Sequence, residues 1–206
     1  TLEMITAAGG SGSEHLADLS DKTAAVELYE AAARQDGPFD ILVNNAGMIR
    51  RADAVDFSEA DWDDVLDLNL KTAFFLSQAF GKAAMADDRH AAIVNIASVL
   101  SFQGGIRVAS YTASKHGICG LTRLLACEWA ARNVNVNAIA PGYIVSNNTE
   151  ALREDPDRSA AILGRIPAGR WGEASDIGGA AVFLASDAAR YVHGAVLPVD
   201  GGWLAR

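Results

Sequence analysis

The chain has 206 residues, of which 50% are hydrophobic and 21% are charged. This length and composition predict a single globular domain over residues 1–206 and exclude a disordered or low-complexity chain. The formal net charge of -9 disfavours a protein that binds the phosphate backbone of nucleic acids. No apolar run is long enough to cross a bilayer and residues 1–8 lack an export signal, so we expect no membrane association and a cytoplasmic protein.

Helical stretches alternate with short apolar strands, which is the pattern of βαβ units around a parallel sheet. The strands are apolar nearly throughout, as expected where helices cover both faces of a sheet. The predicted fold is therefore α/β, with a doubly wound, Rossmann-like parallel sheet. In chain order we expect helix 1–8, strand 14–17, helix 22–35, strand 41–45, helix 59–85 with Ser58 and Asp61 as its capping box, strand 93–96, helix 111–132, strand 134–139, helix 149–164 with an irregularity at Pro156, helix 175–185 and strand 195–199.

The glycine cluster near the start, Gly9 to Gly12, does not follow an apolar strand. A dinucleotide-binding glycine fingerprint lies between the first strand and the first helix of its fold. We therefore interpret the cluster as a helix end followed by a loop, in preference to a turn that binds a pyrophosphate. On this interpretation the chain begins inside an α/β domain and lacks the N-terminal, glycine-rich βαβ unit.

Tyr111 and Lys115 are four positions apart and share one face of a predicted helix. An ammonium group beside a phenol favours the phenolate, and lowering the pKa of a tyrosine from ~10 to ~7 requires about 4 kcal/mol. One cation at ~4 Å in an effective dielectric of ~20 supplies about that much. Ser98 closes a predicted strand at the carboxyl edge of the sheet, where its hydroxyl can bond a substrate carbonyl beside the phenol.

These residues, with the Asn44-Asn-Ala-Gly47 motif, Asn69 and Pro141-Gly142, resemble the short-chain dehydrogenase/reductase family in order and spacing. The resemblance runs from about Asp18 to Gly202. It implies an enzyme that transfers a hydride between a nicotinamide cofactor and a secondary alcohol or ketone. By the same resemblance, Tyr111 is the general acid/base, Lys115 lowers its pKa and bonds the nicotinamide ribose, Ser98 orients the reacting oxygen, and Asn69 holds a water for a proton relay.

The resemblance also implies a cofactor site. Asp18 corresponds to the aspartate near the adenine, and residues 45–47 correspond to the turn below the adenosine ribose. NAD is the expected cofactor, without excluding NADP. The two cysteines and four histidines lack the spacing of a metal site, so we expect no metal. The predicted cofactor-binding residues are Asp18, Asn45, Ala46, Gly47, Tyr111, Lys115, Pro141, Gly142, Ile144 and Ser146.

Several stretches are more specifically similar to family members that act on deoxy sugar acids, namely residues 44–51, 98–107, 141–148, 165–172 and 200–206. Such a substrate combines one carboxylate with several hydroxyl groups. Arg107 is the predicted ligand of the carboxylate, because a guanidinium can bond it with two parallel N–H groups, although it can equally pair with a surface acid. Gln103, Tyr143 and Asn147 are predicted to bond the hydroxyls, and Arg50 and Arg51 to add positive potential.

Two alternative functions remain open. One is a 3-oxoacyl-thioester reductase of the same family. The other is a catalytically silent assembly subunit, which the missing glycine turn suggests. The helices at 59–85 and 111–132 resemble those that join subunits in the family, so we expect a homodimer or homotetramer.

Overall fold

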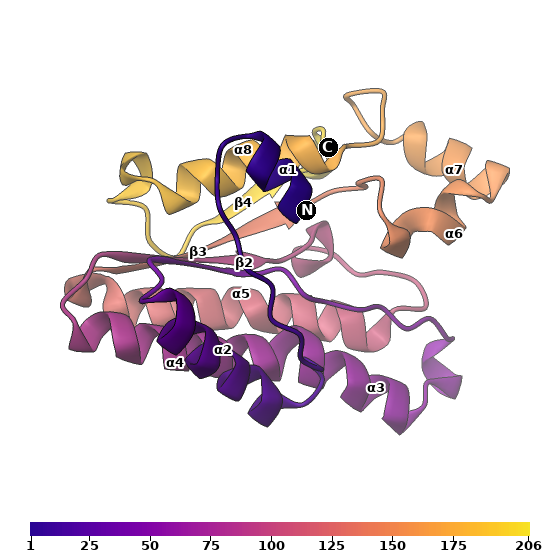
Figure 1. Ribbon diagram of the computed structural model, residues 1–206. Coiled ribbons are helices and arrows are strands. Elements are labelled where there is room, and N and C mark those ends of the chain that lie inside the picture. Colours follow the sequence, from indigo (N-terminus) through magenta and orange to yellow (C-terminus); the bar gives the residue numbers. More distant parts are fainter.

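Four parallel strands form one sheet in the computed structural model, which describes residues 1–206 (Figure 1). Leu42 lies opposite Ile93, and Ile93 lies opposite Val136, so the register runs without a break across the first three strands. Because all the strands are parallel, their carboxyl ends meet at one edge of the sheet. In spatial order the strands are β1 (Ile41–Asn44), β2 (Ala91–Ile96), β3 (Val134–Pro141) and β4 (Val196–Val199).

Helices cover both faces of this sheet, which confirms the predicted doubly wound α/β fold. Figure 1 shows α2, α3, α4 and α5 on one face, α8 on the other, and α6 and α7 beyond the carboxyl ends of the strands. No helix is both long and apolar enough to span a bilayer. The helices are α1 (Leu2–Ala7), α2 (Lys22–Asp36), α3 (Glu59–Leu66), α4 (Ala73–Ala86), α5 (Ala109–Trp129), α6 (Glu150–Arg153), α7 (Pro156–Leu163) and α8 (Ala174–Ala185).

The core lies on both sides of the central strands, because neighbouring residues of a strand point to opposite faces. Ile93 packs with Phe80 of α4 and Leu125 of α5, whereas Val94 packs with Leu184 of α8. All of these side chains are buried. This two-sided packing explains why the strands are apolar nearly throughout.

The predicted strand at residues 14–17 is wrong, since no strand forms there. The segment is held against the end of α2 instead: the Ser13 hydroxyl and the His15 ring each bond the Asp36 carboxylate, at 2.6 and 2.8 Å. The Leu16 side chain, which a strand would have packed on the core, is 91% exposed.

Two predicted helices are divided. The helix at 59–85 contains a wider π-helical turn, η2 (Asp67–Thr72), between α3 and α4, and Asn69 lies in that turn. The helix at 149–164 breaks at Pro156, because proline cannot supply the N–H that a helix interior needs. Proline is favoured at a helix start, and here it opens α7 after the N-cap Asp155.

The packing of α4 on α5 predicts unequal effects of two glycine substitutions. A Cβ at Gly81 would lie 2.7 Å from the Trp129 ring, so Gly81→Ala is expected to lower the free energy of unfolding by about 1–3 kcal/mol. Gly178 in α8 has open space around it, so Gly178→Ala is expected to raise that free energy by up to about 1 kcal/mol. Urea unfolding measures both, and equal stability of the two variants would contradict the helix contact.

Candidate active site

Two cavities at the carboxyl edge of the sheet share a wall that contains Ser98 and Tyr111. The first has a volume of about 530 Å³ and is called here the arginine cavity. The second has a volume of about 680 Å³, contains Lys115 in its wall, and is called the lysine cavity. The arginines that name the first cavity are Arg51, Arg158 and Arg165.

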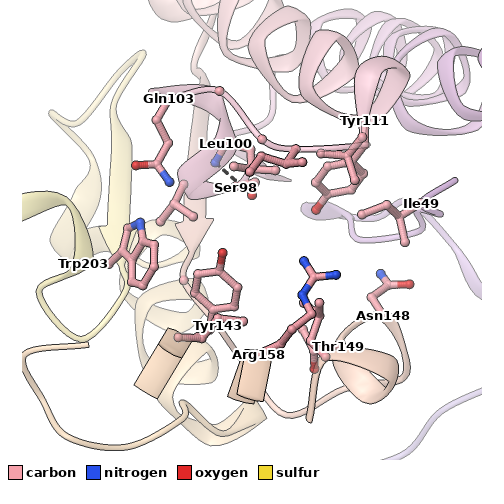
Figure 2. Close-up of a pocket in the computed structure, with 18 of the residues that line it drawn as sticks. Ile49, Ser98, Leu100, Gln103, Tyr111, Tyr143, Asn148, Thr149, Arg158 and Trp203 are labelled. Carbon is pink, nitrogen blue, oxygen red and sulfur yellow. Dashed lines mark hydrogen bonds between the residues drawn. The ribbon is translucent and has the colours of Figure 1, made fainter. Parts of the chain in front are cut away.

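The ends of β2 and α5 bring the two hydroxyl groups of the shared wall together. Ser98 lies two residues after the end of β2, and its hydroxyl accepts a hydrogen bond from the Leu100 N–H at 3.1 Å. Tyr111 lies in the first turn of α5. Figure 2 shows the Tyr111 hydroxyl pointing toward Ser98 and into the cavity. The structure therefore juxtaposes the serine and the tyrosine that the sequence singled out.

Lys115 is buried one helical turn beyond Tyr111, with 5% of its surface exposed. Its Nζ donates a hydrogen bond to the Ile96 carbonyl at 2.6 Å and lies 5.5 Å from the centre of the Tyr111 ring. Burial lowers the pKa of Lys115 to about 8, because the charged ammonium group is desolvated.

Burial and two neighbours act on the pKa of Tyr111. Burial of the phenol raises the pKa, while the neighbouring Ser98 hydroxyl and the charge of Arg51 lower it to a smaller extent. The Lys115 ammonium group lies 5.5 Å from the centre of the ring and bonds the Ile96 carbonyl. The role of Lys115 in lowering the pKa of Tyr111 stays a prediction.

Asn69 joins three parts of the site without lining either cavity. Its side-chain oxygen accepts a hydrogen bond from the Met48 N–H, and its amide group donates to the Met48 carbonyl, both at 2.9 Å. The amide group also donates to the Ser114 hydroxyl of α5 at 3.2 Å. Asn69 thus ties η2 to α5 and to the turn at Gly47, and its role in a proton relay stays a prediction.

Most of the predicted cofactor-binding residues surround the lysine cavity. Its wall combines small residues, such as Gly47, Ala97 and Gly142, with polar ones, such as Asn45 and Ser146, which suits a ligand with polar groups such as a ribose. At Gly142 a Cβ would lie 2.7 Å from the Cα of Asp200, so only glycine allows the ends of β3 and β4 to approach this closely. The predicted residues that line the cavity are Asn45, Ala46, Gly47, Tyr111, Lys115, Pro141, Gly142, Ile144 and Ser146.

Asp18 is the exception among those residues, because it lies outside the lysine cavity. Its exposed carboxylate accepts hydrogen bonds from the N–H and the hydroxyl of Ser20, at 2.9 and 2.7 Å. These bonds lower the pKa of Asp18. In this structure Asp18 stabilises the turn that precedes α2.

The predicted substrate residues are separated. Gln103 and Tyr143 line the arginine cavity, but Asn147 lines the lysine cavity. Arg107 lines neither, because its guanidinium group pairs with the Asp53 carboxylate at 3.0 Å. The backbone of Arg107 is left-handed, with φ +63°. Its neighbour Ile106 lines the arginine cavity, whereas Arg107 does not. The structure therefore shows Arg107 paired with a surface acid, the alternative that the sequence left open, and its contact with a substrate carboxylate stays a prediction.

Sequence reasoning missed Arg158 and Arg165 as cavity residues. Arg158 lies in the first turn of α7 and Arg165 lies two residues after its end. Nothing in the sequence marked Arg158, and Arg165 stood out only as the first residue of the stretch 165–172. The Arg165 guanidinium lies 4.1 Å from the centre of the Trp203 ring. None of the 21 residues that line the arginine cavity is an aspartate or a glutamate, so its wall is positively charged.

Comparison with known proteins decides the family. A family model described as enoyl-(acyl carrier protein) reductase matches residues 1–204. The chain is 58% identical over 206 residues to 2-dehydro-3-deoxy-D-gluconate 5-dehydrogenase of Escherichia coli K12, a match that covers 100% of this chain and 81% of that protein. The chain belongs to the short-chain dehydrogenase/reductase family. It is therefore an oxidoreductase, as the motifs predicted.

Two solved structures of the family share its fold closely. One, from Agrobacterium tumefaciens, is named for 2-deoxy-D-gluconate 3-dehydrogenase activity and contains NADP; it is 64% identical, with a TM-score of 0.94 over 100% of this chain and 81% of that one. The other is a gluconate 5-dehydrogenase from Burkholderia cenocepacia in complex with NADP and tartrate. It is 34% identical, with a TM-score of 0.95 over 100% of this chain and 80% of that one.

The pKa of Lys115 links the stability of the fold to pH. It lies near 8 in the folded chain, against an ordinary value of 10.5, so between these pH values the unfolded chain binds the additional proton and stability rises with pH. At about 1.4 kcal/mol per pH unit, the gain approaches ~3 kcal/mol. Denaturant unfolding is expected to show the wild type gaining stability relative to Lys115→Met over this range, and parallel pH curves would contradict the buried ammonium group.

Proposed function

We propose that this chain is a nicotinamide-dependent dehydrogenase that interconverts a secondary alcohol and a ketone of a deoxy sugar acid, as a 2-dehydro-3-deoxy-D-gluconate 5-dehydrogenase does. The observation that carries the proposal is the shared wall: Ser98 and Tyr111 face a cavity that has arginines and no carboxylate in its lining. A chain with a net charge of -9 concentrates positive charge there, which suits an anionic substrate. The names of the relatives, and the tartrate in one of the solved structures, support an acid with hydroxyl groups.

Tyr111 moves the proton in this proposal. When bound in the lysine cavity, the nicotinamide cofactor supplies or accepts the hydride. In reduction, the Tyr111 phenol donates its proton to the carbonyl oxygen of the substrate while Ser98 donates a hydrogen bond to the same oxygen. In oxidation, the Tyr111 phenolate accepts the proton of the alcohol. The raised pKa of Tyr111 keeps the phenol protonated in this structure, which is the state required for reduction.

The lysine cavity suits the nicotinamide end of the cofactor, which NAD and NADP have in common. In this proposal Lys115 holds a ribose hydroxyl and the backbone near Ile144 holds the carboxamide, since both residues line the cavity. NAD is our proposal for the cofactor, with NADP as the alternative because both solved relatives described above contain it.

The alternative functions find less support. The acyl chain of a 3-oxoacyl thioester carries no carboxylate, so it would leave three guanidinium groups of the cavity without a counter-ion. A silent assembly subunit would have no use for Ser98, Tyr111 and Lys115 at one wall. The proposal of a sugar-acid dehydrogenase accounts for both features.

We also propose that the chain forms a homodimer or homotetramer through the helices at 59–85 and 111–132, that is, α3, η2 and α4 on one side and α5 on the other. Between them lies an open groove lined by Leu66, Asp67, Leu70, Lys71, Phe74, Gly117, Gly120 and Leu121. Apolar side chains at an open groove favour contact with a second copy of the same face. Light scattering at micromolar concentration is expected to give two or four times the mass of one chain, and the mass of a single chain would contradict the proposal.

Substitution of Tyr111 tests the assigned chemistry. With 2-dehydro-3-deoxy-D-gluconate as substrate, Tyr111→Phe is expected to lower kcat by about 100- to 10,000-fold, the usual contribution of a general acid/base. Reduction of the cofactor, followed by absorbance, measures the rate with NAD+ and with NADP+. The matched control is Tyr191→Phe, because Tyr191 is 100% exposed and remote from both cavities. Turnover by Tyr111→Phe equal to that of the control would refute the role of Tyr111.

A further inference from the structure

Arg158 presents an uncommitted guanidinium group to the arginine cavity. It lies in the first turn of α7, where the Asp155 carboxylate accepts hydrogen bonds from the N–H groups of Asp157 and Arg158, at 3.1 and 3.0 Å. Figure 2 shows the side chain of Arg158 projecting into the cavity, between Tyr143 and Asn148 and toward Tyr111. The guanidinium group itself makes no hydrogen bond or ion pair within the chain, so all five of its N–H donors are available.

The other two arginines of the cavity are already engaged by the protein. Arg165 stacks on the ring of Trp203, with 4.1 Å between the guanidinium carbon and the ring centre. Arg51 donates a hydrogen bond from Nη2 to the Asn148 carbonyl at 2.9 Å. Arg158 is therefore the one arginine of the three whose guanidinium group is held neither by stacking nor by a hydrogen bond.

Arg158 and Arg51 also lie close enough to repel each other. Burial lowers the pKa of the Arg51 guanidinium, and the charge of Arg158 lowers it further. Neither arginine has a carboxylate partner, and no acidic residue lines the cavity. An anion placed between two guanidinium groups relieves this repulsion and accepts hydrogen bonds from both.

We propose that Arg158 binds the carboxylate of the substrate, opposite Arg51, and so makes the enzyme select sugar acids over neutral polyols. This inference rests on the function proposed above. A guanidinium group and a carboxylate are both planar and can form two parallel N–H···O bonds, which fixes the orientation of the substrate as well as its charge. The reacting carbon then faces Ser98 and Tyr111 on the neighbouring wall.

The test compares two substrates that differ at one group. 2-Deoxy-D-gluconate carries a carboxylate where 2-deoxy-D-glucitol carries a hydroxymethyl group. For Arg158→Met, kcat/KM with the acid is expected to fall by about 10- to 100-fold, the usual contribution of a hydrogen bond to a charged group, whereas kcat/KM with the polyol changes by less than about threefold. Arg158→Lys, which keeps the charge but loses the paired donors, is expected to give an intermediate loss.

Arg190→Met is the control for the loss of one positive charge, because the exposed Arg190 pairs with Asp187 on the surface. It is expected to leave the preference for the acid unchanged. The double variant Arg51→Met/Arg158→Met is expected to lose less than the product of the two single losses, since both side chains bind one carboxylate. Fully multiplicative losses would show that the two arginines do not share a ligand.

A binding measurement separates this inference from the proposed function. Calorimetry with 2-deoxy-D-gluconate and the Tyr111→Phe protein, in the presence of the cofactor, is expected to show weaker binding when Arg158→Met is added. A wild type that turns over acid and polyol equally would refute the proposed function. A wild type that prefers the acid, with the same preference and affinity retained in Arg158→Met, would refute the role of Arg158 alone. Because no protein group bonds the Arg158 guanidinium, we expect Arg158→Met to unfold at the same temperature as the wild type.

Discussion

One buried contact between α5 and β2 sets the geometry of the site. The Lys115 ammonium group donates to the Ile96 carbonyl at 2.6 Å, and the Ser101 hydroxyl donates to the Lys115 carbonyl at 2.6 Å. Both bonds join the helix that carries Tyr111 to the strand end that carries Ser98. Burying an ammonium group is unfavourable unless it is bonded, so the helix has little freedom to move relative to the strand. These buried bonds therefore fix the distance between the Ser98 and Tyr111 hydroxyls.

The parts of the structure that depend on periodicity could be predicted from the sequence. The four observed strands and α5 follow directly from apolar runs and helical spacing, and Ser98 and Tyr111 lie together because a strand end and a helix face are fixed by local pattern. Asn69 lies in a π-helical turn that the pattern of a continuous helix did not reveal. The conformation of residues 14–17 depends on tertiary contacts that the local pattern does not reveal. Ser13 and His15 bond Asp36 of α2, and the segment does not join the sheet.

The spacing of residues in the sequence could not predict in which direction a side chain points or how deeply it is buried. The direction of Arg107 accompanies a left-handed backbone conformation and a partner, Asp53, that lies far away in the sequence. The direction of the pKa shift of Tyr111 depends on how much of the phenol is desolvated, which spacing from Lys115 does not indicate. Arg158 enters the cavity because Pro156 starts a new helix there, and a continuous helix would have placed it differently.

The segment between Ile144 and Gly172 leaves and rejoins the body of the protein at one point. Ile144 pairs with Gly172, the Val145 N–H donates to the Gly172 carbonyl at 2.8 Å, and the Gly172 N–H donates to the Tyr143 carbonyl at 2.9 Å. The ends of this excursion are therefore fixed at one place beside the site, while its middle packs on the C-terminal residues, where the Ala168 N–H donates to the Gly201 carbonyl at 2.9 Å. A substitution on the cavity side of the excursion can thus reshape the cavity wall while the pairing of the four strands stays intact.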